Sequence, residues 1–116
     1  MSRAYTKEEI KEMFLKDCYN KAKFWANVDD PNMSVEDKCM GVVHSILNII
    51  DGTSGNTDCG FLLIPVTHET DMPYAIEQGR NYFPPQTKEQ EDGDIAGDDY
   101  LHHDFHRLET EMKNGN

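Results

Sequence analysis

The sequence predicts an α+β fold that is mostly helical, with two packed amphipathic helices, one short apolar edge strand and a histidine-bearing C-terminal helix. Apolar residues recur every three or four positions in two N-terminal segments and one C-terminal segment, as in helices with one buried face. A short apolar run bounded by glycine and threonine indicates the strand. With 116 residues, of which 37% are hydrophobic, the chain has room for a single domain, residues 1–116, with a small core.

The first helix is predicted to span residues 7–26. Thr6 and Glu9 have the spacing of a capping box, in which each side chain accepts a hydrogen bond from the other residue's backbone N–H. The helix ends before Pro31, because a proline keeps the preceding Asp30 out of the helical conformation. The apolar side of this helix carries Ile10, Met13, Phe14, Cys18, Ala22 and Trp25.

The second helix is predicted to begin after Ser34, with acidic residues in its first turn, and to end at Asp51 and Gly52. Its apolar stripe is the strongest in the chain, so we expect it to supply most of the core. The stripe consists of Val35, Cys39, Val42, Val43, Ile46, Leu47 and Ile50. His44 and Asn48 lie four residues apart beside the stripe, where we expect an exposed or mutually hydrogen-bonded pair.

The strand is predicted at residues 61–66. Pro65 places it at the edge of a sheet, because proline lacks the N–H that a central strand donates. A strand needs a neighbour to bond its backbone. That neighbour is either a poorly marked strand at residues 81–83 or the same strand of a second copy.

The remaining chain is predicted to hold two further helices separated by an acidic flexible segment at residues 86–97. A short helix is expected at residues 73–78, where a proline and a glycine mark its two ends. The C-terminal helix should run from Asp98 or Asp99 to about Lys113. Its apolar side carries Leu101, Phe105, Leu108 and Met112.

Acidic residues outnumber basic ones by 22 to 11. Residues 1–38 hold seven Lys and Arg against eight Asp and Glu, whereas residues 39–116 hold four against fourteen. Direct binding to nucleic acid is disfavoured, because neutralising phosphates needs clustered Lys and Arg. The acidic run is either a solvated linker or a surface that docks a basic protein partner. The residues expected to form that interaction surface are Glu89, Glu91, Asp92, Asp94, Asp98 and Asp99.

The sequence predicts a cytoplasmic protein without a membrane partner. No apolar run reaches the ~20 residues of a membrane span, and the N-terminus lacks a signal-peptide pattern. Cys18, Cys39 and Cys59 form no CxxC pair, and their odd number favours free thiols. Cys18 and Cys39 lie on predicted buried faces, which argues against a cysteine nucleophile.

Histidines cluster in the C-terminal helix. His102 and His106 lie four residues apart, the spacing at which one helix offers two imidazoles to zinc, manganese or iron. His68 follows the predicted strand and joins the group if the helix packs against the end of that strand. The predicted metal ligands are His68, Asp99, His102, His106 and Glu109. Surface histidines bonded to acids such as Asp99 and Asp104, or acid–base chemistry without a metal, stay open as alternatives.

Four segments in order resemble a group of small uncharacterised proteins encoded by phages, prophages and mobile elements. The segments read SILNIIDG, GFLLIPVTHETD, IEQGRNYFP and DIAGDDYLHHDFHRL, and the resemblance covers residues 40–108. The chain resembles that group in an ILxxxDG helix end, an FxLxPxxHxxD segment and a helix start similar to DIAGxxLHxxF, from which it departs by the insertion of Asp98 and Asp99 before Tyr100. The resemblance implies an interaction role, such as antagonism of a host nucleic-acid-binding or defence protein, and implies no enzymatic activity.

We therefore expect a non-catalytic protein that acts by protein–protein interaction with a basic partner and needs no cofactor. The alternative is a small metal-binding protein or metal-dependent hydrolase that holds a divalent metal with its histidines and acids. A homodimer that pairs the predicted strands or buries the stripe of the second helix also stays open.

Overall fold

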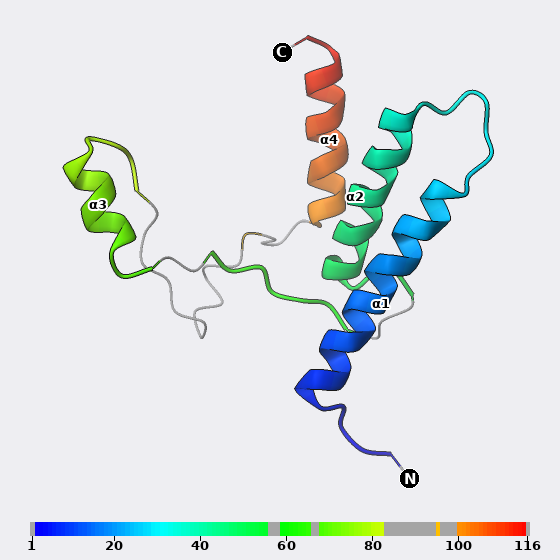
Figure 1. Ribbon diagram of the computed structural model, residues 1–116, viewed down its shortest axis with the longest axis horizontal. Coiled ribbons are helices and arrows are strands. Elements are labelled where there is room, and N and C mark those ends of the chain that lie inside the picture. The colour runs from blue at the N-terminus through cyan, green and yellow to red at the C-terminus, as the bar shows by residue number, and fades with distance from the viewer. Residues whose placement is uncertain (1, 56–58, 66–67, 83–94, 96–99, 116) are drawn as a thin grey trace. The chain divides into compact units, whose positions relative to one another are not determined.

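The computed structural model describes residues 2–55, 59–65, 68–82, 95 and 100–115. These residues form four helices, labelled in Figure 1: α1 (Lys7–Ala26), α2 (Val35–Asp51), α3 (Asp71–Glu77) and α4 (Leu101–Lys113). Contacts divide the chain into two compact units. The first unit combines residues 1–61 with 99–116 and holds α1, α2 and α4, while the second comprises residues 62–98 and holds α3.

Both N-terminal helices begin with a capping box. Thr6 Oγ1 accepts the Glu9 N–H at 3.1 Å, and Glu9 Oε1 accepts the Thr6 N–H at 2.9 Å. The Arg3 guanidinium and then the Thr6 backbone lower the pKa of Glu9 to about 2. Ser34 and Asp37 repeat the arrangement at α2, with distances of 3.0 and 3.1 Å. The predicted bounds of both helices are confirmed. They could be predicted because a capping box forms within one helical turn.

At the contact between α1 and α2, the Trp25 indole packs against two small residues of α2, Gly41 and Ser45, which together form a notch. A Cβ at Gly41 would lie 2.6 Å from carbons of the Trp25 indole, so the close approach requires glycine at this position. Trp25 Nε1 also donates to Ser45 Oγ at 2.8 Å. Two small residues one turn apart therefore receive the indole, and Ile49, one turn further along α2, is fully buried.

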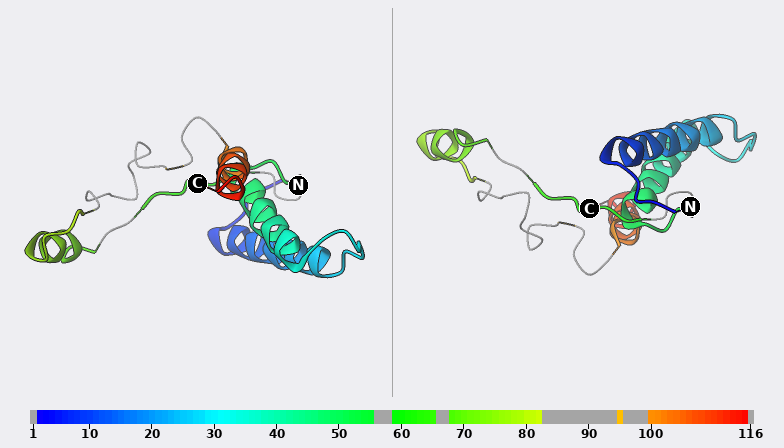
Figure 2. Two further views of the ribbon diagram at one scale, coloured as in Figure 1. Left: turned by 90° about the horizontal axis from the view of Figure 1, so that it is seen from above. Right: turned by 90° about the horizontal axis from the view of Figure 1, so that it is seen from below.

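The second neighbour of α2 is α4, which does not contact α1 in the part of the chain that the structure describes. Figure 2 shows α1 and α4 on different sides of α2. α2 and α4 run antiparallel, because Asp51 at the end of α2 bonds the start of α4. At the other end, Glu36 near the start of α2 and Lys113 at the end of α4 line one groove. The three helices form one layer with α2 in the middle.

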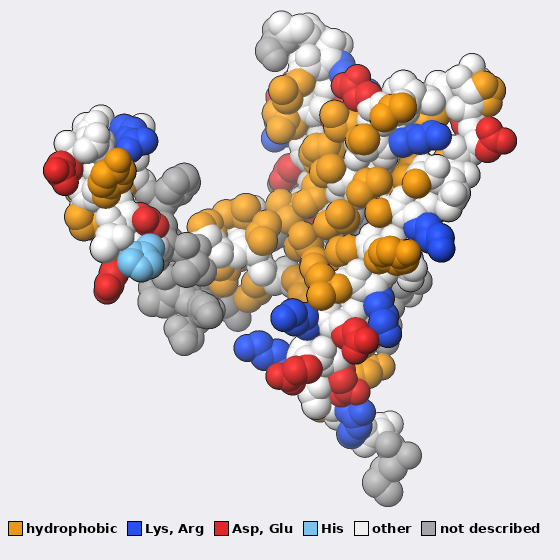
Figure 3. Space-filling model, in the orientation of Figure 1, with side chains coloured by type: hydrophobic (Ala, Val, Ile, Leu, Met, Phe, Trp, Pro, Cys, Tyr) orange, Lys and Arg blue, Asp and Glu red, His pale blue; other side chains and the backbone are white. Residues whose placement is uncertain are grey.

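The predicted core stripe of α2 is only partly covered: Val42, Ile46, Leu47 and Ile50 are half-buried, whereas its other three residues are exposed. Among the described residues Ile49 is the buried hydrophobic residue, and it is not a member of that stripe. Val35 and Val43 are 78% and 42% exposed, and Cys39 is exposed rather than buried as predicted. α1 and α4 contact other sides of α2, which leaves the line through these three residues open. Figure 3 shows hydrophobic side chains gathered over α2 and adjoining parts of α1 and α4.

The predicted α+β class is wrong, since the described residues form helices and no strand. Residues 61–65 of the predicted strand are irregular, and the Phe61 N–H donates to the Ile50 carbonyl at the end of α2 at 2.8 Å. Residues 81 and 82 of the suggested partner strand are irregular as well, and residue 83 lies outside the described residues. A short apolar run has no periodicity that separates a strand from a packed irregular segment, which explains the error.

The other predicted boundaries differ by a few residues. α3 begins at Asp71 instead of residue 73, and α4 begins at Leu101 instead of Asp98 or Asp99. The predicted acidic segment at residues 86–97 lies outside the described residues except for Ile95. In the described residues no helix is long and apolar enough to cross a membrane.

Candidate functional site

The start of α4 is held by a carboxylate from a different helix. Tyr100, which precedes α4, forms no side-chain cap. Instead, the Asp51 carboxylate accepts the Leu101 N–H at 3.0 Å and the His102 N–H at 2.9 Å. His102 Nδ1 lies 2.6 Å from the same carboxylate, which is 1% exposed, and the imidazole side chain is 12% exposed. Asp51 thus performs the role of an N-cap across the α2–α4 contact.

Burial and hydrogen bonding act in opposite directions on Asp51. Burial raises the pKa of the carboxyl group, but hydrogen bonds from His102 and Leu101 outweigh that effect, so the pKa is lower than usual. The N-terminal end of the α4 dipole also favours a negative charge at this place. Asp51 is therefore a carboxylate at neutral pH, and it holds α4 by charge as well as by geometry.

Aromatic rings surround His102, the imidazole that contacts this carboxylate. The His102 ring stacks on Tyr100 at 5.4 Å and meets the edges of His44 at 5.4 Å and His103 at 4.2 Å. The Asn48 amide donates to His44 Nδ1 at 3.3 Å, so the predicted His44–Asn48 pair is confirmed. Burial and then the charge of His102 lower the pKa of His44. The cluster formed by Asp51, His102, His44, Tyr100 and His103 is named the capping cluster below.

An aspartate that orients a histidine is also a component of hydrolytic triads, in which the histidine activates a hydroxyl or thiol. Among the described residues, no hydroxyl or thiol is hydrogen-bonded to His102. The hydrogen bonds that Asp51 accepts are those of a helix cap. The capping cluster therefore supports an anchoring role for α4 better than a catalytic one.

The predicted metal ligands are placed as follows. His68 lies in the 62–98 unit, where its Nδ1 is 2.8 Å from Thr70 Oγ1. In the other unit, His102 bonds Asp51, His106 is exposed, and Glu109 pairs with Lys113 at 3.3 Å.

Asp99, the fifth predicted ligand, lies outside the described residues. Within the ranges that the structure describes, no group of three or more His, Cys, Asp and Glu side chains could hold a metal. The metal site stays a prediction. The alternative of histidines bonded to nearby acids is right in kind for His102, although its partner is Asp51 rather than the predicted Asp104.

The predicted acidic interaction residues all lie outside the described residues, and their role stays a prediction. These are Glu89, Glu91, Asp92, Asp94, Asp98 and Asp99.

A groove of about 330 Å³ opens between α2 and α4, at the end of this helix pair opposite to Asp51. Its sides include Glu36 and Met40 from α2, and the rest of the lining comes from α4. The α4 residues are Phe105, Leu108, Glu109, Met112 and Lys113. Leu108 and Met112 are 46% and 64% exposed, so the groove has an apolar floor that is open to solvent. The groove combines two features that the sequence shows separately, namely the apolar side of α4 and the acidic first turn of α2.

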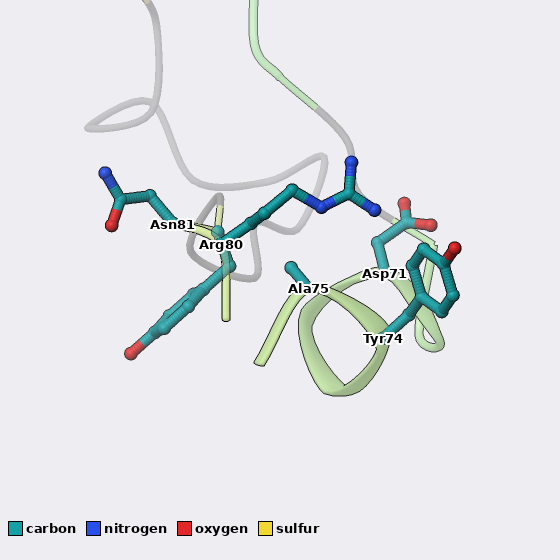
Figure 4. Close-up of a pocket in the computed structure, with 6 residues that line it drawn as sticks. Asp71, Tyr74, Ala75, Arg80 and Asn81 are labelled. Carbon is teal, nitrogen blue, oxygen red and sulfur yellow. The ribbon is translucent and has the colours of Figure 1, made fainter. Parts of the chain in front are cut away.

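A second depression, of about 320 Å³, lies beside α3 in the 62–98 unit (Figure 4). The Arg80 guanidinium carbon lies 5.5 Å from the centre of the Tyr74 ring, and its side chain is directed toward Tyr74 and Asp71 in Figure 4. The lining residues are exposed except for Ala75. This is an open surface beside a short helix, and we assign it no function.

Asp51 was not among the predicted site residues, although the sequence contains one signal for it. A carboxylate in the last turn of a helix lies at the negative end of the helix dipole, where acids are unfavourable. Such a residue needs a compensating partner, and here the partner is the start of α4.

No protein-family model matches the chain, and no curated protein or solved structure is significantly similar to it. The resemblance to phage-encoded proteins therefore stays a prediction.

Proposed function

We propose that this protein acts by binding another protein, which covers the open apolar side of α2, and that the partner is basic. The observation that supports this proposal is the exposed part of the stripe of α2. Cys39 is exposed and Val43 is 42% exposed on a helix that is the middle element of its layer, where burial would be expected.

Packing energetics favour a partner. A domain is normally built from at least two packed layers, and a single layer of three helices buries few side chains. The described large hydrophobic side chains that are exposed on α2 and α4 include Val35, Val43, Leu108 and Met112. Each scattered apolar side chain is ordinary on a protein surface, but a group over adjacent helices is typical of an interaction site.

Charge favours a basic partner over nucleic acid. The formal net charge of −11 repels phosphate backbones and attracts positively charged surfaces. The acidic residues predicted to dock a partner, Glu89 to Asp99, would accelerate its encounter through this attraction. The resemblance to phage proteins supports a host protein as the target.

The test is capture of partners from host-cell lysate by the native chain and by two matched variants. The first variant carries Val35→Ser and Val43→Ser on α2, and the second carries Leu15→Ser and Tyr19→Ser on α1. We expect the native chain and the α1 variant to recover the same basic proteins, and the α2 variant to recover about tenfold less. Recovery should also fall as salt rises above physiological ionic strength, because salt screens the charges. Equal recovery by the native chain and the α2 variant would contradict the proposal.

A further inference from the structure

We infer that the groove between α2 and α4 binds an amphipathic helix of the partner that carries Lys or Arg beside its apolar residues. This inference rests on the proposed function and specifies the chemistry of the partner. It follows from the floor of the groove, from its rim and from the arrangement of its two walls.

The floor is apolar and open. Met40 from one wall and Phe105, Leu108 and Met112 from the other contribute hydrophobic side chains, and the last two are about half exposed or more. The volume of about 330 Å³ is near the lower limit of pockets that bind ligands, about 300–1,000 Å³. It is large enough to receive a few side chains of a partner, whose backbone would lie outside it.

The rim is acidic on both walls. Glu36 lies on the α2 wall and Glu109 on the α4 wall, and Lys113 pairs with Glu109 at 3.3 Å. Two carboxylates and one ammonium group therefore line the groove. The excess negative charge is complementary to Lys or Arg on both sides of an apolar stripe.

The walls favour a helix as the occupant. The lining of α4 runs from Phe105 to Lys113, which is about 12 Å at 1.5 Å per residue, or slightly more than two turns. A helix lying in such a groove inserts apolar residues at positions i, i+3 or i+4, and i+7, a spacing that matches this length. A second copy is a poorer occupant, because symmetric pairing would set the acidic rim against an identical acidic rim.

The first probe is a synthetic fluorescent peptide of about 18 residues, built from Leu and Lys with helical periodicity, long enough to form a helix. A peptide of the same composition with the Leu positions scrambled is the control for nonspecific attraction. Binding is measured by fluorescence anisotropy with the full chain. We expect the periodic peptide to bind at least about tenfold more tightly than the scrambled one. Equal affinities would overturn the inference.

Apolar variants locate the binding site. Leu108→Ser with Met112→Ser removes apolar surface from the groove, and Leu15→Ser with Tyr19→Ser removes similar surface from α1. The groove variant should weaken binding of the periodic peptide about tenfold, and the α1 variant less than about twofold. Circular-dichroism melts check that both variants stay folded. Equal weakening by the two variants would place the peptide outside the groove.

Charge variants test the rim. Glu36→Gln with Glu109→Gln neutralises both walls, whereas Glu8→Gln with Glu12→Gln neutralises two acids of α1. The comparison is matched, because Glu12 pairs with Lys16 four residues away as Glu109 pairs with Lys113. The rim variant should weaken binding severalfold more than the α1 variant at low salt. Equal effects would show attraction to net charge and overturn the inference.

Two further results separate this inference from the proposed function. If the peptide does not bind the groove, but capture from lysate still depends on Val35 and Val43, the inference fails and the proposed function stands. If analytical ultracentrifugation shows a dimer that Leu108→Ser with Met112→Ser dissociates, a second copy occupies the groove and the inference is overturned. If the peptide binds the groove, but capture of partners from lysate does not depend on Val35 and Val43, the inference is supported and the proposed function is contradicted.

Discussion

The two contacts of α2 are held by different kinds of interaction. On the α1 side, Trp25 fits against Gly41 and bonds Ser45, so this contact depends on shape. On the α4 side, a buried carboxylate, Asp51, accepts two backbone N–H groups and faces His102. The first contact should be indifferent to pH, whereas the second should weaken when its charges change. One helix thus carries a permanent contact on one side and a titratable contact on the other.

The largest effect is expected from the substitution Gly41→Leu, which breaks the shape-dependent contact between α1 and α2. A Cβ would lie 2.6 Å from the indole, and the rest of the leucine has no space, so overpacking outweighs the ~1 kcal/mol that leucine gains in helix propensity. We expect a net loss of about 2–3 kcal/mol in the free energy of unfolding, measured by urea denaturation.

A double-mutant cycle provides the control for this prediction. In a Trp25→Ala background the indole is absent, so Gly41→Ala should be neutral or stabilising by up to ~1 kcal/mol. A Gly41→Ala variant that destabilises both backgrounds equally would show that the notch is not the cause.

The second prediction concerns the charged contact. Asp51→Asn keeps the shape but removes the charge, and it should lower the free energy of unfolding by about 1–2 kcal/mol at pH 7. Because the folded pKa of Asp51 is lower than usual, its contribution is complete above the unfolded pKa of about 3.9 and is lost as pH falls through the folded pKa. Urea denaturation of both proteins at pH 7 and pH 3 tests this prediction. A difference that does not shrink at pH 3 would contradict it.

The smallest effect is expected from His44, whose ring contacts His102 on the α4 side of α2. Burial and the charges of His102, His106 and His103 lower its pKa, while Glu109 acts in the opposite direction. The unfolded chain therefore binds the proton more readily, and stability falls as pH drops below about 6.5. The loss should be below about 1 kcal/mol, and His44→Gln should remove it. Melting temperatures at pH 7 and 5.5 measure the slope, and an unchanged slope in the variant would exclude His44 as its source.

The parts of the fold that depend on neighbouring residues could be predicted from the sequence. The bounds of α1 and α2 follow from Thr6, Ser34 and the residues three positions after each, which bond within one turn. The start of α4 could not be predicted in this way. Its cap is Asp51, which lies 50 residues away from Leu101 in the sequence, and no local pattern reports such a contact.

Periodicity identified the apolar sides of the helices without showing what covers them. The stripe through Val35 and Val43 was a correct prediction of an apolar side and a wrong prediction of a core, because α1 approaches α2 at Gly41. A notch of small residues has no hydrophobic signal, although the Trp25 indole packs against it. For the candidate site, His102 was predicted as a metal ligand, and that role stays a prediction. Asp51 was not predicted, since its unfavourable place in the last turn of a helix suggests a partner without showing which one, and only the tertiary contact identifies it.

The position of the 62–98 unit within the chain has a consequence for evolution and engineering. The chain leaves α2 with the Phe61 N–H on the Ile50 carbonyl and returns with the Leu101 N–H on Asp51, so both junctions meet at adjacent residues of one helix end. The intervening segment therefore connects α2 to α4 from two points that lie close together at one helix end. Closing a loop costs only about 0.6 kcal/mol more for each doubling of its length. Descendants of this chain could therefore lengthen, shorten or exchange that segment as a cassette while the three-helix unit, with its groove, stays unchanged.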